Sequence, residues 1–329
     1  MMFKKYGWES ALFLLLIVEI LGFGFVNPRM LELNVLLYST SDFIYIGMLA
    51  LPLTLIIVSG GMDISFGSTA GLCAIVLGLL FKSGLPLSLA ITLTFVVGGL
   101  CGLLNALLVI YTKVNPLVIT LGTMYLYGGG ALLLSGFAGA TGYEGIGGFP
   151  DSLLDFANQT VFAIPTPIIY FLIMTVVFWL LMHKTTTGRS VFFIGQSERT
   201  SRYSAVPINK TLFIIYALIG LVAAFVAVLL VSYFGSARSD LGSSLLMPVL
   251  TAVVLGGANI YGGAGSIIGT AIAALLIGYL QQGLQMVGVP NEISSALSGA
   301  LLIIVLIGKS LSQYSGQLRH WLKRHPLKN

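Results

Sequence analysis

Apolar runs separated by short polar stretches recur along the whole chain. A helix needs about 20 apolar residues to cross the ~30 Å hydrocarbon layer of a membrane, and most of these runs approach that length. The pattern predicts an all-α, polytopic integral membrane protein with about ten transmembrane helices in a single domain, residues 1–329. The expected spans are 10–26, 43–59, 66–81, 87–110, 116–136, 165–182, 211–234, 246–260, 266–286 and 293–308.

Composition excludes a water-soluble fold and several kinds of chemistry. Hydrophobic residues make up 57% of the chain and charged residues only 8%, whereas soluble domains carry about 25% charged residues. Cys73 and Cys101 both lie in apolar runs, which argues against a disulfide framework or a cysteine metal site. Because His183, His320 and His325 all lie outside the expected spans, an intramembrane Ser-His protease or a histidine-ligated metalloenzyme is not expected.

The basic residues predict how the chain is oriented. With the N-terminus inside and ten spans, 13 of the 16 Lys and Arg residues fall on the inside, as the positive-inside rule requires. Only Arg29, Lys82 and Arg238 fall outside. We therefore expect both termini in the cytoplasm, with the basic tail 309–329 at the membrane surface. The same distribution accounts for the basic charge without nucleic acid as a partner.

Two connecting loops are long enough to have their own structure. The loop 137–164 is expected outside and contains acidic residues but no Lys or Arg. The loop 183–210 is expected inside, is basic, and is predicted to hold a short interfacial helix around Ser190–Ile194.

Glycine-rich interruptions in the third and eighth spans suggest an internal repeat. Aligning Pro52 with Pro248, an offset of 196 residues, brings several helix-breaking residues into register. The matched positions are Gly60 with Gly256, Gly61 with Gly257, and Asp63 with Asn259. Transporters often contain such repeats, and their broken helices line the solute route. Chance matching in glycine-rich segments is the alternative, and Asp63 or Ser65 could simply cap the next helix.

Three further glycine pairs, each four residues apart, have the spacing of close helix packing. They are Gly67 with Gly71, Gly98 with Gly102, and Gly265 with Gly269. We interpret them as packing faces.

The chain shows no energy source of its own. Gly308-Lys309-Ser310 ends like a phosphate-binding loop, but Ile303 stands where that motif needs its first glycine. Glu19 is the one acid placed well inside an apolar run, and a proton- or sodium-coupled transporter would normally need more than one. If ATP drives this protein, a partner must bind it.

A few uncharged polar residues inside the spans could form a route for a neutral, hydroxyl-rich solute. Such a solute needs hydrogen-bonding groups along its way, because removing water from a hydroxyl without replacement costs about 1–3 kcal/mol. The alternative is that they bond neighbouring helices. The candidates are Asn105, Thr120, Thr123, Gln281 and Gln282.

Several motifs together resemble those of a known transporter family. They are Ser59–Ser68, Asn115–Thr123, Thr187-Gly188-Arg189 with Ile194-Gly195, and Leu255–Ala258 with Gly262-Gly263-x-Gly265-Ser266. The chain resembles, over essentially its whole length, permeases of bacterial ABC importers of the ribose, arabinose and galactose type. Through the segments 138–145 and 232–240, it looks most like the second membrane subunit of the importers that take up autoinducer-2.

The resemblance implies a multi-pass permease of the bacterial inner membrane that binds no cofactor itself. Its implied partners are a second homologous permease, ABC ATPase subunits that bind ATP and Mg, a periplasmic solute-binding protein and membrane lipid. It further implies alternating-access import of autoinducer-2. A pentose or hexose such as ribose is the alternative solute, and an ion-coupled secondary transporter or a membrane-embedded enzyme is the alternative class.

By the same resemblance, the inner loop docks on the ATPase. The coupling role falls on Gly188, Arg189, Gly195, Gln196 and Ser197. Pro207 departs from the family pattern, which usually has a glycine near this point, and leaves the end of the docking segment open.

Overall fold

The computed structural model describes most of the chain as a bundle of long helices. Described are residues 7–137, 139, 145–290, 293, 294, 296, 297, 299–301, 303–305 and 307. The tail 309–329 therefore lies outside the described residues, as does most of the segment 138–145. The expected tenth span is described only in part, and its described residues from 293 to 307 are helical.

Short 3-10 helices and one small hairpin interrupt the α-helices. The first elements are α1 (Gly7–Val26), η2 (Pro28–Leu31), α2 (Leu33–Val58), α3 (Phe66–Lys82), α4 (Leu87–Thr112), α5 (Pro116–Phe137) and α6 (Asp151–Asn158). There follow β1 (Thr160–Val161), β2 (Ile164–Pro165), α7 (Thr166–Lys184), α8 (Thr186–Gln196) and α9 (Glu198–Tyr203). The last are α10 (Ile208–Phe234), η3 (Ser243–Leu245), α11 (Leu246–Leu255) and α12 (Ile267–Met286).

Seven helices in the described part of the chain are long and apolar enough to cross a membrane. They are α1, α2, α4, α5, α7, α10 and α12. Two expected spans correspond to shorter apolar helices, α3 with 17 residues and α11 with 10. At 1.5 Å per residue, α11 rises about 15 Å, half of the hydrocarbon thickness. The prediction of a helix over 246–260 is therefore wrong beyond Leu255, where two glycines end α11.

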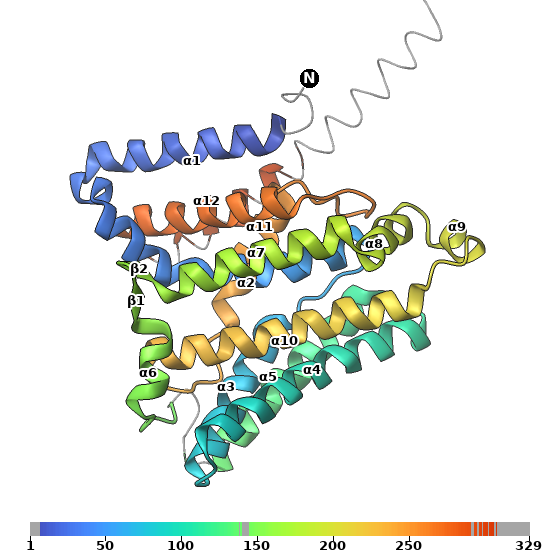
Figure 1. Ribbon diagram of the computed structural model, residues 1–329, viewed down its shortest axis with the longest axis horizontal. Coiled ribbons are helices and arrows are strands. Elements are labelled where there is room, and N and C mark those ends of the chain that lie inside the picture. The colour runs from blue at the N-terminus through green and yellow to red at the C-terminus, as the bar shows by residue number, and fades with distance from the viewer. Residues whose placement is uncertain are drawn as a thin grey trace, which may run out of the picture.

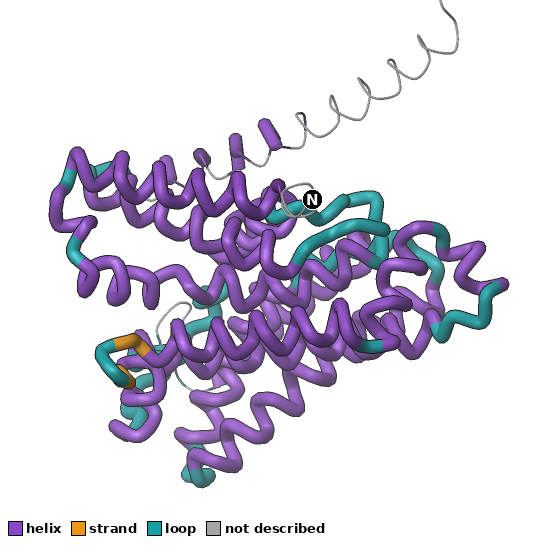
Figure 2. Tube along the Cα trace, turned by 45° about the horizontal axis from the view of Figure 1, so that its top comes forward, coloured by secondary structure: helices purple, strands orange, loops and turns teal. Residues whose placement is uncertain are grey.

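Helix α2 forms the centre of the bundle. Every residue from Phe43 to Val58 is buried, and α2 packs against α7, α10, α11 and α12. Helix α1 lies outside α12, whereas α3, α4 and α5 lie on the other side of α10 (Figure 1). The connecting elements divide between the two ends of the bundle, with α6 and the β1-β2 hairpin at one end and α8 and α9 at the other (Figure 2).

Helix α2 also begins ten residues before the expected span. The polar run Ser39-Thr40-Ser41-Asp42 looks like the end of a span in the sequence but is helical in the structure. The Thr40 hydroxyl donates to the Leu36 carbonyl over 2.7 Å and also lies 2.7 Å from the Tyr279 hydroxyl of α12. These contacts satisfy Thr40 inside the bundle, so the run does not interrupt the helix.

Close glycine packing holds α4 against α10. A side chain at Gly102 would meet the carbonyl of Tyr216, and one at Gly98 would meet the carbonyl of Gly220. The packing face predicted for this pair is therefore confirmed. Gly67 and Gly71 of α3 face backbone too, but it belongs to the loop between α10 and η3 rather than to a helix.

We predict that Gly102→Ala loosens the contact between α4 and α10. The added methyl group would meet backbone that cannot swing aside, and such overpacking costs about 1–3 kcal/mol. The midpoint of thermal unfolding of the purified protein should fall. Gly129→Ala in α5 is the matched control, because no other atom lies within 4 Å of the position its methyl group would take. Equal midpoints for the two variants would contradict the packing argument.

Candidate functional site

Two interrupted helices meet near one end of the bundle. Helix α2 ends with Gly60 N–H donating to the Ile57 carbonyl and Gly61 N–H donating to the Ile56 carbonyl. Helix α11 ends in the same way, through the N–H groups of Gly257 and Ala258. Gly60 and Gly257 both have positive φ angles, 82° and 108°, which this type of helix end requires and which glycine adopts without strain.

Each break also contains the same kind of side-chain turn, and this likeness supports the internal repeat. The Asp63 carboxylate accepts a hydrogen bond from Ser65 N–H, and the Asn259 side-chain oxygen accepts one from Tyr261 N–H, each two residues further on. The sequence alignment pairs Asp63 with Asn259 correctly. At the helix ends, however, Gly60 corresponds to Gly257 and not to Gly256, because the second break is one residue shorter between its positive-φ glycine and its turn.

Partners from distant elements satisfy the backbone groups at these breaks. Gly263 N–H donates to the Val58 carbonyl over 2.8 Å and so joins the second break directly to the first. The Trp8 indole donates to the Leu255 carbonyl, and the Tyr216 hydroxyl donates to the Met62 carbonyl. Non-helical backbone at membrane depth is tolerated only where such partners or water replace the missing helical hydrogen bonds.

The place where the two breaks are joined is called the junction below. Helix α8, in the expected coupling loop, ends there. A side chain at Gly195 would meet both the Val58 carbonyl and Gly263 N–H, the two groups that join the breaks. Gln196 packs its side chain against Gly263. The structure thus brings together three motifs that lie far apart in the sequence.

The other expected coupling residues lie around this contact. Gly188 packs on the last carbonyls of α7, and its N–H is capped by the Thr185 hydroxyl at 3.1 Å. Ser197 caps α9 by accepting from Thr200 N–H. Arg189 is exposed and points away from the packed core, with no ion pair to any residue that the structure describes. It is therefore free to meet a partner protein.

A buried polar network stands beside the first break. Asp63 is fully buried and accepts from the Ser65 hydroxyl over 2.7 Å and from the Asn105 amide over 3.3 Å. The same amide donates to the Ser65 hydroxyl, while the Asn105 oxygen accepts from the Tyr127 hydroxyl. The network ties α3 to α4 and α5. Asp63 therefore organises Ser65, the residue before α3, instead of capping the helix itself.

The structure places the five expected pathway residues in different surroundings. Asn105 belongs to the buried network. Thr120 and Thr123 are also buried, and their hydroxyls bond to carbonyls of their own helix, α5. Gln281 and Gln282 lie on α12, and Gln282 lines a separate cavity at the other end of the bundle.

That cavity contains functional candidates that sequence reasoning missed. It has a volume of about 540 Å³ and lies between α2, α10, α12 and the α6 end of the outer loop. Asp42 of α2 faces it and accepts a short hydrogen bond from the Tyr233 hydroxyl of α10. An acid more than two turns inside a long apolar helix is a signal for such a site, but the predicted span began only at residue 43.

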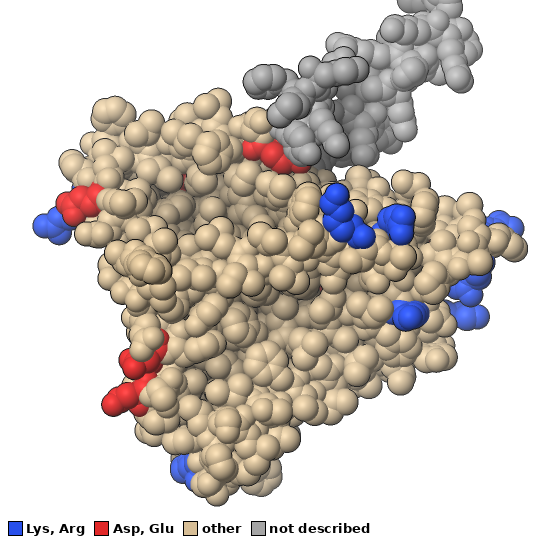
Figure 3. All heavy atoms as spheres, in the orientation of Figure 1, with Lys and Arg blue, Asp and Glu red and all other residues tan. Residues whose placement is uncertain are grey.

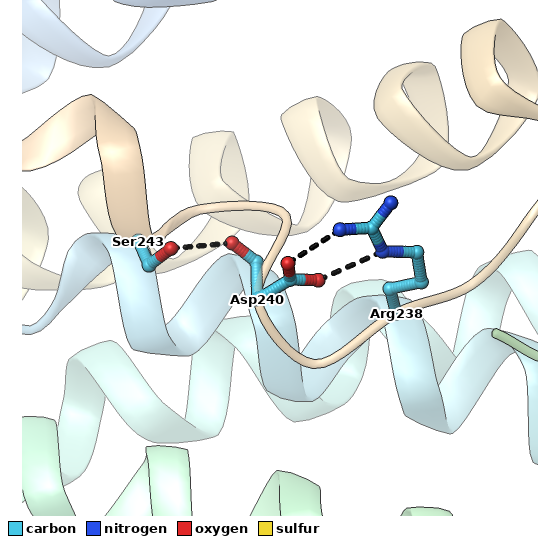
Figure 4. Close-up of polar contacts among 3 residues, drawn as sticks. All are labelled: Arg238, Asp240 and Ser243. Carbon is cyan, nitrogen blue, oxygen red and sulfur yellow. Dashed lines mark hydrogen bonds and ion pairs between the residues drawn. The ribbon is translucent and has the colours of Figure 1, made fainter. Parts of the chain in front are cut away.

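The loop after α10 closes the same end of the bundle. Residues Ile146 and Ala237 exchange both backbone hydrogen bonds, each 2.9 Å long. Figure 4 shows the Arg238 guanidinium facing the Asp240 carboxylate, with 2.9 Å from Nε to Oδ1, while Ser243 bonds the Asp240 carbonyl. This pairing raises the pKa of Arg238, so the guanidinium stays charged. The ion pair holds the loop that packs on Gly67 and Gly71.

Charge divides between the two ends of the protein. In Figure 3, Lys and Arg gather at the end that carries α8 and α9, and most acidic residues lie toward the opposite end. The exposed cations at the first end are Lys113, Lys184, Arg189, Arg199, Arg202 and Lys210.

Comparison with known proteins identifies the family. The family described as branched-chain amino acid transport system / permease component matches residues 35–306. The chain belongs to this permease family. The match covers both breaks, α8, the Asp63 network and the cavity, so all of these features lie within the permease unit.

Individual relatives are much more similar than family membership alone requires. The permease is 69% identical over 320 residues to the autoinducer 2 import system permease protein LsrD of Escherichia coli strain K12, and the match covers 97% of each chain. The LsrD proteins of Shigella flexneri and Escherichia coli O157:H7 match to the same extent. No solved structure matches the chain. The resemblance inferred from the sequence motifs is confirmed.

We predict that Asp63→Ala destabilises this permease. The change leaves the Ser65 N–H and hydroxyl buried without their acceptor, at a cost of about 1–3 kcal/mol for each group, and removes one of the two acceptors of the Asn105 amide. The unfolding midpoint of the purified protein should drop, whereas the exposed Asp155→Ala should leave it unchanged. An unaltered midpoint for Asp63→Ala would show that the network does not hold α3, α4 and α5 together.

Proposed function

We propose that this chain is a membrane-spanning subunit of an ATP-driven importer and translocates autoinducer-2 across the bacterial inner membrane. It works with a second homologous permease, with ABC ATPase subunits that bind ATP and Mg, and with a periplasmic solute-binding protein. It performs no covalent chemistry. Support comes from relatives named as autoinducer 2 import permeases that are 69% identical over nearly the full length.

The end that carries α8 and α9 faces the cytoplasm in this proposal. Its exposed cations support the assignment, because cytoplasmic segments of membrane proteins carry an excess of Lys and Arg. Both termini then lie in the cytoplasm, and ten spans in all would complete the bundle. The end with α6 and the β1-β2 hairpin faces the periplasm, where a solute-binding protein would dock.

The contact between Gly195 and the joined breaks is the observation that carries the mechanism. A movement of α8 driven by a partner ATPase cannot leave Val58 and Gly263 undisturbed, since the backbones touch with no side chain between them. The two breaks are also where the transmembrane helices depart from regular geometry, so they can act as hinges. In this proposal ATP binding shifts α8, the breaks transmit the shift to α2 and α12, and the pathway opens inward.

The direct test is solute uptake by cells that lack this chain and by the same cells complemented with it. Autoinducer-2 and ribose are compared, each with a wild-type and a hydrolysis-deficient partner ATPase. We expect autoinducer-2 uptake to require both the chain and active ATPase. Uptake that survives without ATPase but stops when the proton gradient collapses would indicate a secondary transporter. If only the uptake of ribose depended on the chain, ribose would replace autoinducer-2 as the proposed solute.

We predict that Arg189→Glu uncouples transport. The residue is exposed on α8, the helix whose Gly195 contacts the joined breaks, so reversing its charge weakens docking on the ATPase without disturbing the permease core. Uptake should fall at least about tenfold, equivalent to 1.4 kcal/mol of lost coupling, while the amount of permease in the membrane stays normal. Arg29→Glu, on an exposed arginine at the other end, is the matched control. If the Arg189→Glu variant took up solute at the wild-type rate, Arg189 would not be part of the coupling surface.

A further inference from the structure

We propose that the cavity between α2, α10 and α12 is a receiving site for a neutral polyhydroxylated solute at the periplasmic face of the permease. The proposal deepens the function above and rests on its orientation of the bundle. The cavity is lined by Ala157 and Asn158 of α6 and so lies at the end of the bundle where a solute released by a binding protein would arrive. All of its lining residues come from this one chain.

The cavity wall is rich in uncharged hydrogen-bonding groups. It offers the amides of Asn34, Asn158 and Gln282 and the hydroxyls of Tyr38, Ser39, Ser41 and Tyr233. Its volume of about 540 Å³ falls within the ~300–1,000 Å³ usual for small-molecule sites.

Unsatisfied polar groups at the inner wall point to a missing ligand. Ser41 lines the cavity, is only 6% exposed, and its hydroxyl has no hydrogen-bond partner among the described residues. One turn deeper on α2, the buried Tyr45 hydroxyl is equally without a partner in the described structure. The Tyr45 ring lies edge-on to the ring of Tyr233, with 6.3 Å between centroids. A buried polar group left unpaired destabilises the protein, and a hydroxyl-bearing ligand or water would supply the missing hydrogen bond.

The single charge in the wall determines the chemical class. Asp42 contributes a carboxylate, and no Lys or Arg lines the cavity, so an anion such as a phosphorylated sugar is disfavoured. Among the residues described, no group of three acidic, His or Cys side chains could hold a metal ion. A carboxylate accepts two hydroxyl protons, and the Ser41 hydroxyl in the same wall can both donate and accept. This set suits adjacent hydroxyls on a neutral solute.

The wall is built on rigid supports. Ser232 at the end of α10 accepts from Ala157 N–H over 2.8 Å and donates to carbonyls of α6, and Asn158 donates to the Ser232 carbonyl. Helix α6 is therefore fastened to the residue beside Tyr233. The Asp42 and Tyr233 side chains hold each other in place across the space between α2 and α10.

The test is solute protection of a cysteine introduced in the cavity wall. Tyr38→Cys, at an exposed position of the cavity wall, is placed in the assembled transporter in lipid nanodiscs, and its alkylation by N-ethylmaleimide is followed with and without solute. The unsubstituted permease gives the background, which should be low because Cys73 and Cys101 are buried. At a concentration about twice the Kd, autoinducer-2 should slow alkylation about threefold. Asn34→Cys, also exposed in the wall, provides the same measurement if Tyr38→Cys does not assemble.

Three controls make the result decisive. The exposed Ser152→Cys on α6 should react at one rate with or without solute. Asp42→Asn, added to Tyr38→Cys, should raise the Kd about tenfold, because the solute hydroxyls lose a charged hydrogen-bond acceptor. The same substitution at Asp151, which does not line the cavity, should leave protection unchanged.

The outcomes separate this proposal from the one on which it rests. Protection by ribose but not by autoinducer-2 would support the receiving site and overturn the proposed solute. Absence of protection by either, in a transporter that still imports autoinducer-2, would overturn the receiving site alone. Equal protection by ribose 5-phosphate would overturn its assignment to neutral solutes.

Discussion

The need to satisfy backbone hydrogen bonds away from water is the constraint on which this structure depends. A continuous helix satisfies its own backbone, but α2 and α11 both stop inside the bundle and leave carbonyls behind. The breaks solve the problem together, since Gly263 of one bonds Val58 of the other, and Trp8 and Tyr216 supply two more donors. If one of the two breaks were disrupted, the backbone groups of the other would therefore lose their hydrogen-bond partners.

This arrangement explains why glycines gather where they do. At Gly195, Gly256 and Gly269, the backbone of another segment lies where a side chain would begin. The contacts give the junction little room to yield, so a displacement of α8 must move the breaks. Close packing of this kind passes a displacement from one segment to the next without a charged relay.

The two ends of the permease use polar groups differently. At the end that carries α8 and α9, the Asp63 network is closed, since its carboxylate, amide and hydroxyls bond to one another. At the other end, the Ser41 and Tyr45 hydroxyls have no hydrogen-bond partner among the described residues, beside the Asp42–Tyr233 pair. A closed network rigidifies a bundle, whereas an open one can bind. Polar residues inside a membrane protein are thus not equivalent candidates for a pathway.

The sequence by itself determined the membrane class, the positions of most long helices, the two glycine breaks and the family, because apolar length, charge asymmetry and short motifs are local properties. It could not show that α2 continues through Ser39–Asp42, since the partner that satisfies Thr40 lies on α12. Only the tertiary structure placed Gly195 on the joined breaks, closed Asn105 into a network and opened the cavity at Asp42. Those outcomes depend on contacts between residues up to about 200 positions apart, which no local pattern encodes.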